Sequence, residues 1–170
     1  MANKNNTLSE KSKIKLENAA EIKIAVIISE WNLDITDSLR KAAVDTLIEN
    51  GISKENVFEF WVPGAFELPL GTKIANDQQN PDALICLGCV IKGETDHDKY
   101  ISQSVAGGLQ SLNLAFSKPV VFGLLTPNTK EQAEERAGGS YGNKGVEAAY
   151  TALRMLELKR IQTKKKIGFQ

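Results

Sequence analysis

The sequence has no excess of charge of either sign, because 21 Lys and Arg residues balance 21 Asp and Glu residues. The lack of a basic excess argues against a nucleic-acid partner, and the lack of an acidic excess argues against a disordered chain. No apolar run is long enough to span a membrane, and the first twenty residues hold no apolar signal core. These absences favour a cytoplasmic globular protein that binds no membrane.

Cysteine is scarce, since Cys86 and Cys89 are the only two in the 170 residues. Their Cys-x-x-Cys spacing is found in redox pairs and in one half of a zinc site. Both fall in a predicted strand, where residues three apart point to opposite faces, and no second cysteine pair completes a metal site. We interpret them as reduced, buried thiols, which fits the cytosol, and expect no metal.

Four short apolar segments alternate with segments of helical periodicity, in a chain long enough to bury the core of one domain. This alternation predicts a three-layer α/β/α sandwich around a parallel sheet. Right-handed crossovers leave few topologies, and we favour the flavodoxin-like strand order 2-1-3-4. The expected domain is 22–159, between a polar N-terminal tail, 1–21, and a basic C-terminal tail, 160–170. Strands are expected at 22–29, 57–62, 83–91 and 119–126. Helices are expected at about 35–50, from the turn at 63–67 to about 76, and at about 98–117, 129–137 and 143–159.

The third predicted strand leads to the only histidine of the chain. Residues 83–91 form an apolar run without alternation, which is typical of a strand buried on both faces. The chain then turns polar at Lys92 and reaches His97. Ligands of open parallel sheets bind beyond the carboxyl ends of the strands, so His97 is a candidate proton carrier. A structural role for a lone histidine is the alternative.

The other strand ends carry aromatic and acidic side chains. Trp31 follows the first strand, Phe66 and Glu67 follow the second, and Phe122 lies near the end of the fourth. Each alone is typical of core packing or a solvated surface, but their shared location favours a pocket for a planar heterocycle. The N–H groups of residues 93–95, ahead of a helix, could hold an anion. Phosphate-loop and dinucleotide signatures are both missing, so the residues alone do not define the reaction.

At these residues the sequence resembles the lumazine synthase family, over about residues 24–158. Five motifs carry the resemblance, in the right order and spacing, and they lie at 31–32, 61–67 (Trp-Val-Pro-Gly-Ala-Phe-Glu), 88–97 (Gly-Cys-Val-Ile-Lys-Gly-Glu-Thr-Asp-His), 119–126, and 131–138 with 142–145. The resemblance implies condensation of 5-amino-6-(D-ribitylamino)uracil with 3,4-dihydroxy-2-butanone 4-phosphate, with release of phosphate and water. It implies no cofactor and no metal.

The resemblance also assigns roles to matching positions. His97 would carry protons between the reacting groups. Phosphate would be held by Glu94, Thr95 and Arg136, with assistance from Lys144. Asp98 stands where the family commonly has an aromatic residue, and we expect it to face solvent at a helix N-terminus. The pyrimidine ring and the ribityl chain would be bound by Trp31, Ala65, Phe66, Glu67, Cys89, Val90, Ile91 and Phe122.

A homo-oligomer is a further implication of the resemblance. Family members form pentamers, and some form decamers or sixty-subunit shells, with active sites between subunits. Phe122 would reach a neighbouring subunit's site, and the N-terminal segment could add to a neighbour's sheet. The absence of an insertion in 138–145 favours a shell. Two other classes stay open on this fold, a flavin-binding or storage module and a non-catalytic container, although intact Trp31, Glu67, His97 and Arg136 favour the enzyme.

Overall fold

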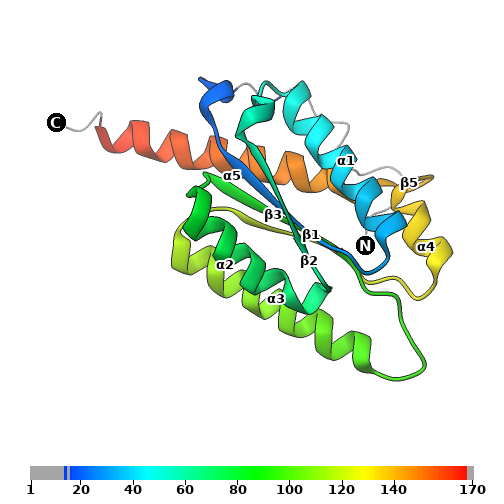
Figure 1. Cartoon of the computed structure of the whole chain (residues 1–170). Coiled ribbons are helices and arrows are strands. Elements are labelled where there is room, and N and C mark those ends of the chain that lie inside the picture. Colours follow the sequence, from blue (N-terminus) through cyan, green and yellow to red (C-terminus); the bar gives the residue numbers. More distant parts are fainter. Residues whose placement is uncertain (1–13, 15, 168–170) are drawn as a thin grey trace.

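The computed structural model describes residue 14 and residues 16–167 and has a four-stranded parallel sheet at its centre. The strands are β1 (Ile24–Ser29), β2 (Val57–Val62), β3 (Ala83–Cys89) and β4 (Val120–Leu125), in the order β2-β1-β3-β4. Helices α1 (Leu33–Glu49) and α5 (Lys144–Ile167) cover one face, and α2 (Leu68–Gln79) and α3 (His97–Phe116) cover the other (Figure 1). The predicted three-layer fold and strand order are confirmed.

Shorter elements connect these layers. A helix, α4 (Lys130–Glu135), follows β4, and the short strands β5 (Ala137–Gly139) and β6 (Gly142–Asn143) form a hairpin before α5. This hairpin occupies most of the segment 138–145, for which the glycine content predicted only a connection. The described residues also include the 3₁₀ turns η2 (Ala19–Glu21), η3 (Lys54–Asn56) and η4 (Ala65–Glu67).

The core consists of two apolar layers, one on each face of the sheet. Along β1, Ile24, Val26 and Ile28 pack toward α1 and α5, while Ala25 and Ile27 pack toward α2 and α3. All six residues of β1 and all seven of β3 are buried, so both central strands are covered on both faces. Full burial of one such aliphatic side chain contributes about 1.5–3 kcal/mol, which explains why these strands lack polar alternation.

The two cysteines are free and lie in different layers, as their spacing predicted. Cys86 belongs to the layer under α2 and α3, and Cys89 to the layer under α1 and α5. Burial raises the pKa of the Cys86 thiol to about 12, against a smaller lowering effect of its hydrogen bond with Thr72, in which Oγ1 and Sγ lie 3.0 Å apart. Burial, with the nearby charge of Asp34, raises the pKa of the Cys89 thiol to about 11.

Both ends of the domain differ from the sequence-based boundaries. Helix α5 continues to Ile167, so the segment expected as a tail from 160 continues the helix for several residues. At the other end, Ile14 is 8% exposed within the core, and the Asn56 side chain donates to the carbonyl of Ala20 at 2.7 Å. The last part of the expected N-terminal tail is therefore attached to this domain. Strand addition by residues 1–13 lies outside the described residues.

Most internal boundaries shift by one to three residues. Strand β3 ends at Cys89, two residues early, although the N–H of Val90 still donates to the last carbonyl of β4 and that of Lys92 to a carbonyl beyond it. Helix α2 continues through the first part of the expected loop 77–82 and ends where Asn80 adopts a left-handed conformation, with φ 44°. Gly51, with φ +93°, follows α1 as predicted for a helix stop. The predicted cap at Thr129 accepts from the Gln132 N–H at 3.3 Å.

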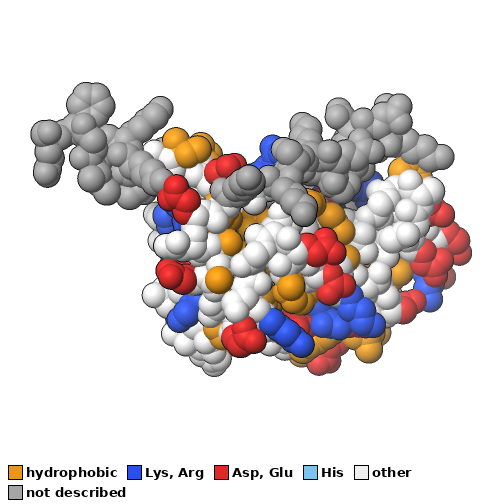
Figure 2. All heavy atoms as spheres, turned by 90° about the horizontal axis from the view of Figure 1, so that it is seen from above, with side chains coloured by type: hydrophobic (Ala, Val, Ile, Leu, Met, Phe, Trp, Pro, Cys, Tyr) orange, Lys and Arg blue, Asp and Glu red, His pale blue; other side chains and the backbone are white. Residues whose placement is uncertain are grey.

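The surface carries both signs of charge. On the visible part of the face seen from above, acidic, basic and apolar side chains are interspersed, and no single sign dominates (Figure 2). Within residues 14 and 16–167, no helix combines the length and the apolar character needed to cross a membrane.

Substitution of Gly145 tests how closely α5 approaches α1. A Cβ atom at Gly145 would lie 1.9 Å from the backbone oxygen of Leu39, which no side-chain movement relieves. We expect Gly145→Ala to lower the free energy of unfolding by about 3 kcal/mol or more. Gly93→Ala is the control, because no atom lies within 4 Å of its added Cβ. Equal stability of the two variants in urea titrations would contradict the close helix contact.

The raised thiol pKa values predict slow alkylation of the folded protein. At pH 8 a thiol with the ordinary value of 9.0 forms roughly 100-fold more thiolate than Cys89 in the fold, and the deficit at Cys86 is larger. Iodoacetamide should therefore label both thiols at least about 100-fold more slowly in buffer than in urea. Mass spectrometry of timed samples measures both rates. Fast labelling of either thiol in buffer would contradict their burial.

Candidate active site

The loop after β1 is fastened to the ends of both neighbouring strands. The backbone N–H of Trp31 donates to the carbonyl of Pro63, beyond β2, at 3.3 Å. The side-chain amide of Asn32 donates to the carbonyl of Cys89, at the end of β3, at 2.9 Å. Asn32 adopts a left-handed conformation, with φ 57°, directly before α1 begins. These contacts hold Trp31 at the carboxyl edge of the sheet, where ligands of such folds bind.

Trp31 and Glu67 meet over the backbone of Gly64. A Cβ atom added to Gly64 would lie 3.5 Å from Cδ1 of Trp31 and 2.9 Å from Oε2 of Glu67. Trp31 is 74% exposed and Phe66 is 59% exposed, so two large aromatic surfaces remain uncovered beside a carboxylate. An exposed indole next to hydrogen-bond acceptors can stack on a planar ligand and accept from its polar substituents. Ala65 differs from its neighbours, because it is buried in the core.

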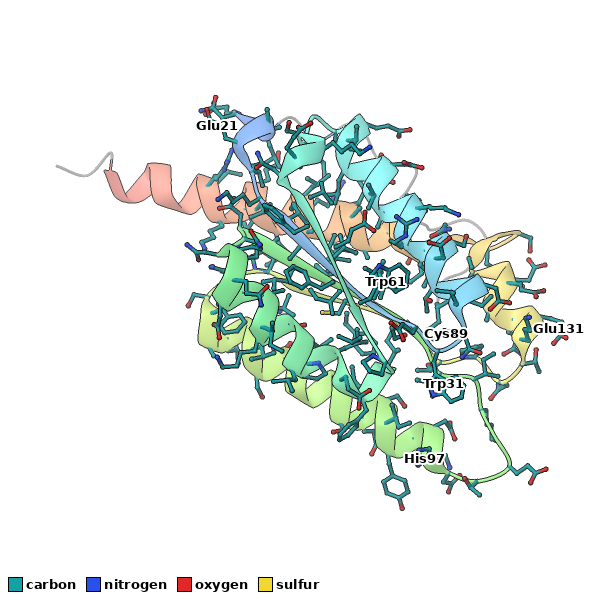
Figure 3. The ribbon with its side chains drawn as sticks, in the orientation of Figure 1. Glu21, Trp31, Trp61, Cys89, His97 and Glu131 are labelled. Atoms are coloured by element: carbon teal, nitrogen blue, oxygen red, sulfur yellow. The ribbon has the colours of Figure 1, made fainter. Side chains whose placement is uncertain are left out.

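His97 stands at the end of a long polar loop. It is the first residue of α3 and is exposed, and it is preceded by the exposed residues Glu94 and Thr95. Figure 3 shows Trp31, Cys89 and His97 toward the same end of the molecule, with Glu21 at the opposite end. Glu94 and Thr95 lie just before the N-terminus of a 20-residue helix, where backbone N–H groups and the helix dipole favour an anion.

The segment 89–91 offers fewer backbone groups to a ligand than its length suggests. The carbonyl of Cys89 already accepts from Asn32, and the N–H of Val90 donates to the carbonyl of Leu125 at 2.9 Å. Ile91 is half-buried and packs at the edge of the core. A ligand at this segment would therefore use the remaining lone pair of the Cys89 carbonyl and the backbone groups that follow it.

Asp98 does not face solvent as expected. It does lie in the first turn of α3, but the residue is half-buried. Its Oδ1 atom is shielded from solvent and has no hydrogen-bond partner among the described residues. The expected place at the helix N-terminus is therefore confirmed, and the expected exposure to solvent is wrong, because packing shields one carboxylate oxygen.

Three other candidate residues share a different hollow. Phe122, Arg136 and Lys144 line an open pocket of about 710 Å³, and Trp31, Phe66, Glu67 and His97 are absent from its lining. One chain thus brings its candidate residues together in two groups. The remaining lining residues are Leu124, Leu125, Thr126, Pro127, Glu131, Gln132, Glu135 and Tyr141.

The hairpin β5–β6 sets Arg136 and Lys144 opposite each other. Ala137 pairs with Asn143, and the N–H of Lys144 donates to the carbonyl of Arg136 at 2.9 Å, which extends the pairing by one residue. The hydroxyl of Ser38 on α1 donates to the carbonyl of Ala137 at 2.6 Å and so anchors the hairpin. Like charges at opposite positions repel each other, and a bound anion would relieve that repulsion.

The two cations differ in their partners. Within the described part of the chain, no ion pair links the Arg136 guanidinium to a carboxylate, whereas Lys144 pairs with Glu147 at 3.0 Å. The same part of the chain holds no cluster of three or more histidine, cysteine, aspartate or glutamate side chains suited to a metal ion. One group therefore offers an aromatic platform, a carboxylate and an imidazole, and the other offers two cations.

Sequence reasoning missed three residues near these groups. Asn32 was part of a recognised motif but received no role, and its link to Cys89 joins residues 57 positions apart. Tyr141 sits in the glycine-rich segment whose hairpin was not predicted. Glu147 had a usable signal, because a carboxylate three residues after Lys144 on a predicted helix indicates an ion pair.

Comparison with known proteins agrees with the motifs. The sequence profile of the family described as 6,7-dimethyl-8-ribityllumazine synthase matches residues 21–160. Proteins of that name from Porphyromonas gingivalis and Cytophaga hutchinsonii are each 48% identical to this chain, over 141 and 142 residues. These matches cover 83% and 84% of this chain and 88% and 89% of the two relatives.

A third relative extends the match. The protein of the same name from Parabacteroides distasonis is 44% identical over 156 residues, which cover 92% of this chain and 98% of that protein. The resemblance stated from the motifs is thereby confirmed. This chain belongs to the 6,7-dimethyl-8-ribityllumazine synthase family.

Proposed function

We propose that this chain condenses 5-amino-6-(D-ribitylamino)uracil with 3,4-dihydroxy-2-butanone 4-phosphate to 6,7-dimethyl-8-ribityllumazine, the penultimate step of riboflavin biosynthesis. The observation that carries the proposal is the meeting of Trp31 and Glu67 over Gly64, at the edge of the sheet to which the His97 loop leads. A planar ring with a hydroxylated chain needs both an aromatic surface and an acceptor at that point.

In this proposal the pyrimidine ring stacks on Trp31, and Phe66 flanks it. The Glu67 carboxylate accepts hydrogen bonds from ribityl hydroxyls. Backbone groups of Cys89, Val90 and Ile91 bind the edge of the pyrimidine. Ala65 acts indirectly, because its buried methyl group fixes the 3₁₀ turn that carries Phe66 and Glu67.

The phosphate of the second substrate binds at the turn of Glu94 and Thr95, through backbone N–H groups at the N-terminus of α3. Arg136 neutralises the dianion, and Lys144 assists. A guanidinium without a carboxylate partner among the described residues suits this role, because it is available for bidentate contacts with phosphate oxygens.

His97 carries the protons. The ring amine of the pyrimidine attacks the ketone and gives an imine with loss of water. Phosphate leaves as His97 removes a proton from the adjacent carbon, and ring closure with loss of a second water completes the product. An imidazole that takes up and returns protons typically contributes about 10²–10⁴-fold, and the joint orientation of two substrates contributes roughly 7–11 kcal/mol.

We further propose that the active site lies between two copies of the chain. Phe122 is 40% exposed on β4, which is an edge strand of the sheet, and the other residues of β4 are all buried. It shares a pocket with Arg136 and Lys144 that omits Trp31, Phe66, Glu67 and His97. A neighbouring copy that brings this pocket over the exposed Trp31 and Phe66 would complete the site. The assembly would be a pentamer, extending to a decamer or a sixty-subunit shell.

Localisation in the cytoplasm is part of the proposal. Both cysteines are free and buried, in a fold that uses no disulfide among its described residues. Free thiols are usual in reducing compartments.

The direct experiment is incubation of the purified protein with both substrates. Appearance of lumazine absorbance and fluorescence would support the enzyme. Tight riboflavin binding without lumazine would indicate a flavin-storage module, and assembly without either activity would indicate a container. Light scattering on the same sample, after size exclusion, distinguishes a pentamer from a decamer or a shell.

Loss of the imidazole should slow the reaction without abolishing it. We expect His97→Ala to reduce kcat by about severalfold to a few hundredfold, because substrate orientation by the remaining groups persists. Steady-state rates of the assembled variant, followed by lumazine absorbance, measure the effect. Complete loss of activity in a folded, assembled variant would contradict a role limited to proton transfer.

Removal of the guanidinium should act on one substrate only. We expect Arg136→Ala to raise the KM for the butanone phosphate by about tenfold or more, since charge-assisted hydrogen bonds to phosphate contribute about 1.5–3 kcal/mol. The KM for the pyrimidine should change little and serves as the internal control. An unchanged KM for the butanone phosphate would contradict phosphate binding by Arg136.

A further inference from the structure

Glu147 is the unusual charged residue of the fold. It is 9% exposed and is the only charged residue in the buried set of the described chain. It lies in the first turn of α5, and its Oε2 atom is 3.0 Å from Nζ of Lys144. Burial of a carboxylate is costly unless the carboxylate is paired, so this ion pair is a condition for the local structure.

Lys144 occupies a position that is unfavourable for a cation in two ways. It is the first residue of the 24-residue helix α5, where the positive end of the helix dipole repels a positive charge. Backbone pairing in the hairpin also sets it opposite Arg136. Glu147 offsets both repulsions from within the same helical turn.

An acidic residue near a helix N-terminus often serves only the helix. Glu131 of α4 fits that description, because it is exposed in a first turn and Thr129 lowers the pKa of its carboxyl through a side-chain hydrogen bond. Glu131 itself lines the pocket shared with Arg136, but Glu147 differs because it is buried and forms an ion pair with Lys144, a cation of that pocket. The ion pair thus links a core carboxylate to the cation that faces the hollow.

We propose that Glu147 is a positioning residue that holds the Lys144 ammonium beside Arg136 for binding of the phosphate-bearing substrate. This inference rests on the proposed function. Before the substrate binds, the negative charge of Glu147 offsets one of the two positive charges and so lets Lys144 stay beside Arg136. The phosphate then meets a preformed pair of donors and does not have to order Lys144 on arrival.

The test compares Glu147→Gln, Lys144→Met and the double variant in the full chain. Glu147→Gln keeps the shape of the side chain and removes its charge. We expect the KM for the butanone phosphate to rise about twofold to tenfold and the KM for the pyrimidine to stay unchanged. A change of this size lies in the lower range of the coupling energies measured between residues of one ion-pair network. In the Lys144→Met background, Glu147→Gln should add nothing. Glu157→Gln, on the same helix and outside the pocket, is the matched control.

A second readout is independent of catalysis. Inorganic phosphate should raise the thermal midpoint of the wild-type protein, and the increase should be smaller for Glu147→Gln and for Lys144→Met. If wild-type protein makes no lumazine but phosphate binding follows this order, the proposed function fails and the positioning role stands. If Glu147→Gln does not fold, Glu147→Asp should bind phosphate with intermediate strength, because the charge is kept and its reach is shortened.

Three results would overturn the proposal. Phosphate could bind Glu147→Gln as tightly as the wild type or more tightly, which would mean that Glu147 only lowers the positive electrostatic potential of the pocket. The effect of Glu147→Gln could be equally large without Lys144. Finally, the pyrimidine and phosphate substrates could lose affinity to the same extent, which indicates a structural role.

Discussion

Parallel pairing of β1 with both β2 and β3 is the constraint on which the site depends. Because these strands run in one direction, their carboxyl ends meet at one edge, and the loops that follow them lie together. Two hydrogen bonds then fasten the loop after β1 to its neighbours, from Trp31 to Pro63 and from Asn32 to Cys89. Trp31 and Glu67, 36 positions apart in sequence, thereby face the same backbone position at Gly64.

A second constraint acts on the cations. The hairpin β5–β6 sets Arg136 and Lys144 opposite each other, and Ser38 ties that hairpin to α1. Gly145 allows the start of α5 to approach the backbone of Leu39, which any side chain at that position would block. Two positive charges are held together by backbone geometry, so the repulsion between them is built into the fold and favours an anionic ligand.

Much of this could be predicted from the sequence, because period and turn chemistry are local signals. The buried strands, their order and the helix stop at Gly51 follow from apolar runs, crossover handedness and a glycine with positive φ. The ends of the domain could not be predicted. The attachment of Ala20 to Asn56 joins residues 36 positions apart, and α5 continues to Ile167 through a polar segment that carries no apolar helical period. The hairpin was missed because its strands have only three and two residues.

Asp98 shows where local signals mislead. Its position in the first turn of α3 suggested a solvated carboxylate, but tertiary packing shields Oδ1 from solvent. The division of the candidate residues into two groups could not be predicted either, because the motifs give the order of residues along the chain and not their distances in space. That division, between Trp31, Phe66 and Glu67 on one side and Phe122, Arg136 and Lys144 on the other, supports the proposal of a site shared by two copies.

Co-assembly of two impaired variants, assayed at a butanone phosphate concentration well below the KM of Arg136→Ala, tests the shared site most directly. Trp31→Ala chains lack the aromatic platform and Arg136→Ala chains lack the guanidinium, yet a site built from the intact half of each would be complete. With random mixing of equal amounts before assembly, about one site in four should regain wild-type activity, measured as lumazine formation. Activity equal to the mean of the two separate variants would show that each chain builds its own site and would contradict the shared arrangement.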